Sequence, residues 1–209
     1  ARLHELTAYL AALRSTFRER NVSIPIYVAA SGPRTLSIAG QEGDGAMVTV
    51  GTHPVLVRRA LEYIRRGALD AGRDPEKIEV VFLAGLAISL DREEARREAA
   101  PVAARRALDA KFHPEFFLPK ELEYLRADAE LVARHYDLQR HTDPGAPHTD
   151  LVTDALVDAF TLAGTPEQCL QKIQAMEEAG ARRVALFPSG KDRRGAVELF
   201  VQAVLPRLD

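Results

Sequence analysis

The sequence predicts an α/β fold in which helices connect the strands of a parallel sheet. Four short runs rich in β-branched and apolar residues are typical of buried strands, namely 24–29, 46–50, 78–90 and 183–187. Amphipathic segments separate these runs, and three of them reach an Ala-Gly pair that is followed by polar residues and a strand. The repeated order of helix, glycine stop and strand indicates αβ units that feed a parallel sheet.

The first half of the chain alternates regularly between helix and strand. An amphipathic helix with Leu6, Leu10, Leu13 and Phe17 on one face precedes the first strand. The first three predicted strands are then separated by two predicted helices, over 34–39 and 54–71. Each of these helices ends at an Ala-Gly pair.

The middle of the chain, over about 91–158, departs from this rhythm. Asp91 is a good N-cap for a helix whose first turn holds Glu93 and Glu94, at the positive end of the helix dipole. No convincing strand follows, so we interpret the segment as a helical insertion. Its turn-rich stretch 141–148 is either a lid or an ordinary surface loop.

The regular alternation returns near the end of the chain. Thr165-Pro166-Glu167-Gln168 has the pattern of a capping box, and it predicts the helix over 167–179 before the last strand. The resulting four β units could form an open four-stranded sheet or half of a closed eight-stranded barrel. They are too few to close a barrel alone.

Composition excludes several classes of partner. The 209 residues are 46% hydrophobic and 28% charged, and the formal net charge is -2. Neither nucleic acid nor a membrane is therefore indicated as a partner. The single Cys169 excludes an internal disulfide framework. No apolar run approaches the roughly 18 residues that span a bilayer, and no signal peptide is recognisable, so we expect a cytoplasmic protein.

The turn after the first strand is the strongest candidate site. Ala29 and Ala30 are small, so we expect an open groove over them. The positive end of the following helix dipole also points outward there, with the free N–H groups of Gly32, Arg34 and Thr35, which suits a phosphate. Hydroxyl groups and one guanidinium could add hydrogen bonds and charge. The other interpretation is a well-capped helix whose small residues permit tight packing. The predicted site comprises Ala29, Ala30, Ser31, Gly32, Pro33, Arg34 and Thr35.

Other polar residues carry weaker signals. The histidines form no metal-binding spacing, so we expect no metal site. We interpret His53 as a loop residue, Asp44 as a structural turn residue and Cys169 as a buried small residue. Residues 189–191 are a second, weaker candidate for binding an anion. We interpret the paired arginines as solvated helix faces; the pairs are 58–59, 65–66, 96–97 and 105–106.

Three blocks of the chain resemble one known family. Residues 24–48, IPIYVAASGPRTLSIAGQEGDGAMV, are similar to the central block of the bacterial luciferase-like family. That family contains flavin-dependent monooxygenases and coenzyme F-420-dependent oxidoreductases, including the methylenetetrahydromethanopterin reductases. Residues 68–96 and 160–190 resemble the next segments of the family in the same order, and the closing stretch 198–208 also agrees.

The resemblance implies a TIM (β/α)8 barrel, of which the chain would hold about the last four β/α units. Residues 1–209 would then be a single domain, the C-terminal part of the barrel, with the insertion at about 91–158. We expect the sequence to be part of a longer protein, because an isolated half barrel would expose both sheet edges and half of its apolar interior.

The resemblance also implies a function. The family binds the cofactor phosphate at the turn that matches residues 29–35. The expected protein is a luciferase-like oxidoreductase that uses coenzyme F-420 or FMN for hydride transfer or monooxygenation of a small organic substrate. The AASGP motif favours F-420, and a homodimer is expected. The alternatives are a non-catalytic flavin-binding or degenerate barrel protein and an unrelated phosphate-binding TIM-barrel enzyme. The sequence identifies no catalytic residue.

Overall fold

The computed structural model describes residues 2–208, with the side chains of residues 4–208. Its strands are β1 (Tyr27–Ala30), β2 (Gly45–Val48), β3 (Glu79–Ile88), β4 (Leu162–Gly164) and β5 (Val184–Pro188). Its α-helices are α1 (Arg2–Glu19), α2 (Pro33–Glu42), α3 (Pro54–Asp70), α4 (Arg92–Phe112), α5 (Pro114–Phe117), α6 (Arg126–His135), α7 (Asp154–Phe160), α8 (Pro166–Glu178) and α9 (Arg193–Ala203). Among these described residues, no helix is long and apolar enough to cross a membrane.

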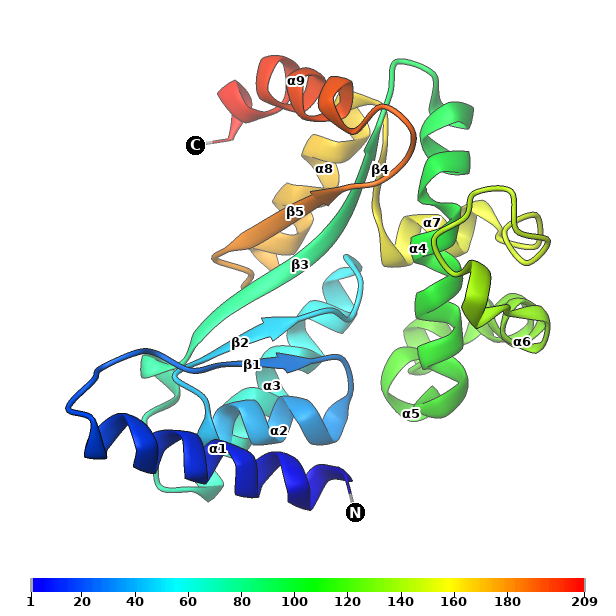
Figure 1. Cartoon of the computed structure of the whole chain (residues 1–209). Coiled ribbons are helices and arrows are strands. Elements are labelled where there is room, and N and C mark those ends of the chain that lie inside the picture. Colours follow the sequence, from blue (N-terminus) through cyan, green and yellow to red (C-terminus); the bar gives the residue numbers. More distant parts are fainter. Residues whose placement is uncertain (1, 209) are drawn as a thin grey trace.

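The strands form one parallel sheet around the long strand β3, which confirms the predicted α/β fold (Figure 1). Phe82 of β3 is paired with both β2 and β5, and Leu86 is paired with both β4 and β5. Strand β5 therefore runs along one edge of β3, while β2 and β4 share the other. Because every pair is parallel, the carboxyl ends of the strands face the same end of the sheet.

All four predicted strands are present with shifted ends, and β4 is an additional strand that the sequence pattern does not predict. Residues 24–26 precede β1 instead of belonging to it. Strand β4 is only three residues long, and it pairs with Leu86, Ala87 and Ile88 at the end of β3. A strand this short shows no period-2 alternation, so hydrophobic patterning does not distinguish it from a loop.

Two of the three predicted glycine stops are confirmed, and the third is wrong. Gly72 and Gly180 follow α3 and α8 with φ angles of +67° and +104°, the left-handed conformation that glycine adopts easily. Gly40 instead lies inside α2, which continues to Glu42. A Cβ atom there would lie 2.0 Å from the carbonyl oxygen of Ile64 in α3. Gly40 is thus needed for the close approach of α2 and α3.

The two faces of the sheet are covered by different helices. Ala84 and Leu86 of β3 belong to an apolar cluster with Leu170 of α8 and Phe200 of α9. On the other face, a Cβ atom on Gly85 would lie 3.0 Å from Val102 of α4. Helices α4, α5, α6 and α7 stand beside this second face (Figure 1), and residues 91–158 contain no strand.

Candidate functional site

Two features lie next to each other at the carboxyl ends of the strands. The first is the segment 29–35, called here the Ser31 turn, which joins β1 to α2. The second, called here the edge cavity, has a volume of about 440 Å³ and lies between the sheet and α4. The backbone N–H of Thr49, which lines the cavity, donates to the carbonyl of Ala30 at 2.9 Å. The Ser31 turn and the edge cavity therefore adjoin each other at the carboxyl ends of β1 and β2.

The backbone of the Ser31 turn is held by a single hydroxyl group. The Thr35 hydroxyl donates to the carbonyl of Gly32 at 3.0 Å and accepts the N–H groups of Ser31 and Gly32, each at 3.2 Å. Pro33 occupies the first position of α2, where its missing N–H costs nothing. The turn is thus fixed before any ligand binds.

This geometry corrects part of the sequence-based expectation. The N–H of Gly32 points to Thr35 and not outward, and the Thr35 hydroxyl is fully used within the turn. Ala29 is exposed, but Ala30 is buried on the opposite face, so no open groove lies over Ala30.

Besides the exposed hydroxyl of Ser31, three groups of the Ser31 turn remain available for a ligand. The N–H groups of Arg34 and Thr35 lie in the first turn of α2 and have no acceptor among the described residues. The exposed side chain of Arg34 likewise has no partner in the described part of the chain. The positive end of the helix dipole adds to this charge, so the turn offers an anion site at its rim.

A histidine of the insertion closes one side of the turn. His113 follows the last residue of α4, and its ring atoms Cδ2 and Nε2 would lie 3.2 and 3.3 Å from a Cβ atom on Gly32. The space beside Gly32 is therefore narrow, and a larger residue at position 32 would have to displace this ring.

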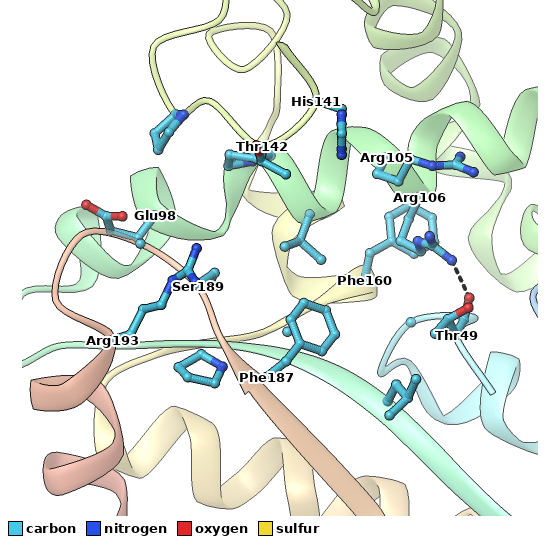
Figure 2. A pocket seen from close by; sticks show the side chains of 18 residues that line it. Thr49, Glu98, Arg105, Arg106, His141, Thr142, Phe160, Phe187, Ser189 and Arg193 are labelled. Carbon is cyan, nitrogen blue, oxygen red and sulfur yellow. Dashed lines mark hydrogen bonds between the residues drawn. The ribbon is translucent and has the colours of Figure 1, made fainter. Parts of the chain in front are cut away.

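The edge cavity is apolar in its middle and polar at two ends. Figure 2 shows Phe187 between two groups of polar side chains, one formed by Thr49, Arg105 and Arg106 and the other by Glu98, Ser189 and Arg193. The further lining residues come from β3, α4 and the loop before α7, and they include Leu83, Gly85, Pro101, Val102, His141, Thr142 and Pro144.

The arginine end of the cavity is built on α4. Arg106 donates to the carbonyl oxygen of Thr49 and contacts Asp109 at 2.9 Å, and only 14% of its side chain is exposed. Arg105 also pairs with Asp109. Burial lowers the pKa of Arg106, while the negative charge of Asp109 acts in the opposite direction.

The interpretation of residues 105–106 as a solvated helix face is therefore wrong for Arg106. The surrounding helix is rich in alanine, and its buried face includes Ala99, Ala103 and Ala107. An arginine beside such a face, with an aspartate three residues later, lies close enough to the buried stripe to be drawn into it. The three-residue spacing of Arg106 and Asp109 beside the alanine-rich face is therefore the sequence signal that could have predicted the burial of Arg106.

The structure gives the weaker candidates mostly structural roles. Asp44 accepts the N–H of Ile26 at 2.8 Å and pairs with Arg14, so it fixes the entry to β1 and β2, as predicted. His53 does not line the cavity; its Nδ1 accepts the N–H of Val55 at 3.2 Å and caps α3. Burial, followed by the charge of Arg58, lowers the pKa of His53, which suits this neutral acceptor role.

The remaining candidates divide between core and cavity. Cys169 is fully buried, as predicted, and burial raises its pKa to about 12. Ser189 lines the cavity, but its hydroxyl already donates to the carbonyl of Leu86 at 3.1 Å. Residues 141–144 form part of the cavity wall. Within the described residues, no group of three or more metal-binding side chains is present.

Comparisons with known proteins agree with the resemblance seen in the sequence. The family model for luciferase-like monooxygenases matches residues 4–183. The 5,10-methylenetetrahydromethanopterin reductase of Archaeoglobus fulgidus is 29% identical over 89% of this chain and 55% of its own length. The enzyme of the same description from Methanolobus tindarius is 30% identical over 87% of this chain and 54% of its own length.

A solved structure supports the same relationship. The coenzyme F-420-dependent tetrahydromethanopterin reductase from Methanopyrus kandleri matches with a TM-score of 0.66 and 27% sequence identity. The match covers 89% of this chain and 51% of that one. The chain thus spans about half the length of the relatives it matches, and its parallel sheet corresponds to part of their fold.

Proposed function

The chain belongs to the luciferase-like monooxygenase family, and we propose that it carries the phosphate-binding side of an oxidoreductase that uses coenzyme F-420 or FMN. The observation that carries this proposal is the fixed Ser31 turn, which offers free N–H groups and Arg34 beside the edge cavity. The similarity to a structure described as F-420-dependent favours that cofactor over FMN.

The residues of the turn fit a cofactor phosphate. The N–H groups of Arg34 and Thr35 and the guanidinium of Arg34 would hold its oxygens, and the Ser31 hydroxyl lies on the same turn. A Cβ atom on Gly32 would fill part of the narrow space in front of His113. When bound, the cofactor supplies the hydride-transfer or oxygenation chemistry.

The protein contributes position and surroundings to that chemistry. Thr35 holds the turn in its binding conformation without using the free N–H groups, so little reorganisation is needed on binding. Phe187, Leu83 and Val102 line the neighbouring cavity and would contact the apolar part of a bound substrate. The substrate is expected to be a small organic molecule that enters this cavity.

Fluorescence titration of the purified protein with F-420 and with FMN tests the proposal. We expect one of the two to bind at micromolar concentrations. We expect Gly32→Val to weaken that binding roughly 10-fold or more, because charge-assisted hydrogen bonds to phosphate would be lengthened or lost. Its effect on folding should be only on the order of 1 kcal/mol, because position 32 is a helix cap with extended backbone and the displaced His113 side chain is 41% exposed and free to move. If neither F-420 nor FMN binds, the oxidoreductase proposal is rejected.

A matched pair of arginine variants separates phosphate binding from general charge. Arg34 and Arg194 each occupy the second position of a helix, in α2 and α9 respectively. We expect Arg34→Gln to weaken cofactor binding about 5- to 10-fold, and Arg194→Gln to leave it unchanged. Equal effects of the two variants would show that the Ser31 turn does not hold the phosphate.

Three expectations about the protein stay predictions. They are a single domain over 1–209 with the insertion at about 91–158, a homodimer and a cytoplasmic location. Size-exclusion chromatography with light scattering would test the homodimer directly.

A further inference from the structure

The arginine end of the edge cavity holds more positive than negative charge. Arg105 and Arg106 share one carboxylate, that of Asp109, which is only 11% exposed. One surplus positive charge therefore remains in a partly buried place. Coulomb attraction to an incoming anion is stronger here than at the surface, because the local dielectric constant is lower.

Both guanidinium groups keep donors for a ligand. The described contacts of Arg106 use its Nη1 atom, toward Thr49 and Asp109, and those of Arg105 also use Nη1. The Nε and Nη2 donors of both side chains have no acceptor among the described residues, and both residues line the cavity. Two neighbouring guanidinium groups with free donors suit the planar, two-oxygen geometry of a carboxylate.

The rest of the cavity determines what the acidic group is attached to. Phe187, which is 43% exposed, lies between the two polar ends (Figure 2), and Leu83 and Val102 also line the cavity, so the body of the ligand contacts apolar side chains. At the far end, Glu98 and Arg193 carry opposite charges. That end is balanced and offers no net attraction for a second acidic group.

We propose that the edge cavity binds a substrate with one carboxylate and an apolar body, with the carboxylate on Arg105 and Arg106 and the apolar part against Leu83, Val102 and Phe187. The assignment of this ligand as a substrate rests on the proposed function. The binding itself is a property of the cavity and is measured without turnover.

A matched pair of probes tests the preference for a carboxylate. Fluorine NMR titrations of the purified protein would compare para-fluorophenylacetate with its neutral amide, para-fluorophenylacetamide. The two probes share the same apolar ring, so a difference in affinity reports on the acidic group. We expect the acid to bind about 10-fold more tightly. Equal affinities would overturn the inference.

Variants on α4 locate the acidic group. Arg105 is 39% exposed, so Arg105→Gln should fold, and we expect it to weaken acid binding about 10-fold while leaving amide binding unchanged. Arg97→Gln is the control, because it makes the same charge change at an exposed position of α4 outside the cavity. Arg106→Lys keeps the charge but loses the planar fork, and we expect an intermediate loss. Equal weakening by Arg97→Gln and Arg105→Gln would contradict the inference.

Cofactor titrations of the same variants keep the two proposals distinguishable. If F-420 and FMN both fail to bind the parent protein, the proposed function fails, and the acid-to-amide ratio still judges the cavity. If a cofactor binds but the ratio is one, only the inference about the cavity fails. If Arg105→Gln weakens cofactor and acid binding by the same factor, the arginine pair holds the cofactor, and the inference is overturned.

Discussion

The contact between α2 and α3 gives a prediction whose size follows from the structure. Gly40 faces α3 so closely that a Cβ atom would lie 2.0 Å from the carbonyl oxygen of Ile64 and 2.8 Å from the backbone nitrogen of Ala68. Gly67 makes the reciprocal approach, since its Cβ would lie 2.2 Å from the carbonyl oxygen of Ser37. The clashing atoms are backbone on both sides, so no side-chain rotation can relieve them.

The expected cost of Gly40→Ala combines two opposing effects. Overpacking a tight contact costs about 1–3 kcal/mol, and the upper end applies because the two helices must move apart. The gain in helix propensity from glycine to alanine offsets about 1 kcal/mol. The net destabilisation is therefore about 2 kcal/mol. For a chain of this size, that lowers the melting temperature by about 4–8 °C.

Thermal melts followed by circular dichroism measure this effect. Gly145→Ala is the matched control, because Gly145 lies in an exposed loop where a Cβ would meet only the Asp143 carboxylate, at 3.3 Å. We expect the control to melt within about 2 °C of the parent, since glycine-to-alanine changes in compatible loops are neutral or slightly stabilising. A Gly40→Ala protein that melts as high as this control would refute the close-contact reasoning.

Two further predictions concern buried titratable groups. His148 is fully buried, its Nδ1 accepts the N–H of Asp137 at 3.3 Å, and burial is the main cause that lowers its pKa from the ordinary value of 6.5. As the pH falls, His148 therefore takes up a proton in the unfolded chain before it does so in the folded chain. The free energy of unfolding should decrease as the pH drops below about 6.5 and should continue to decrease until the pH reaches the folded pKa. Thermal melts between about pH 7.5 and about pH 5 should show a smaller loss of stability for His148→Asn than for the parent protein. An equal loss in the two proteins would contradict the assignment of this pH dependence to His148. Burial raises the pKa of Cys169 to about 12, so its thiol should react with a disulfide reagent only after unfolding in urea; rapid reaction of the folded protein would argue against it.

Hydrophobic patterning was sufficient to predict β1, β2, β3 and β5 and the helices between them, but it missed β4 and the close contacts between elements. The runs that form β1, β2, β3 and β5 are strongly apolar, and burial in a parallel sheet requires such runs. In sequence, Gly40 resembles a helix stop because it follows Ala39 and precedes polar residues, as Gly72 follows Ala71. Only the presence of α3 beside it distinguishes the two glycines, and that proximity is a tertiary property.

The geometry of the candidate site was predictable only where it is local in sequence. The Ser31 turn is continuous, so cap preferences and the proline position are enough to indicate an anion site from the sequence alone. The direction of the Gly32 N–H was not predictable, because the competing acceptor is the Thr35 hydroxyl one helical turn away. The edge cavity could not be predicted at all, since β3, α4, β5 and the loop over 141–144 contribute its walls.

Helix α4 connects the two parts of the site. It lines the cavity with Arg105 and Arg106, and its C-terminal neighbour His113 lies against Gly32 of the Ser31 turn. About seven residues of helix separate Arg106 from His113, a rise of about 10 Å. The sheet therefore supplies the Ser31 turn, whereas the insertion supplies the charge of the cavity and sets the distance between the cavity and the turn. Because the bond from Arg106 to the Thr49 carbonyl ties α4 to the residue that follows β2, a substitution of Arg106 should alter both sites, whereas a substitution of Arg105 should alter only the cavity.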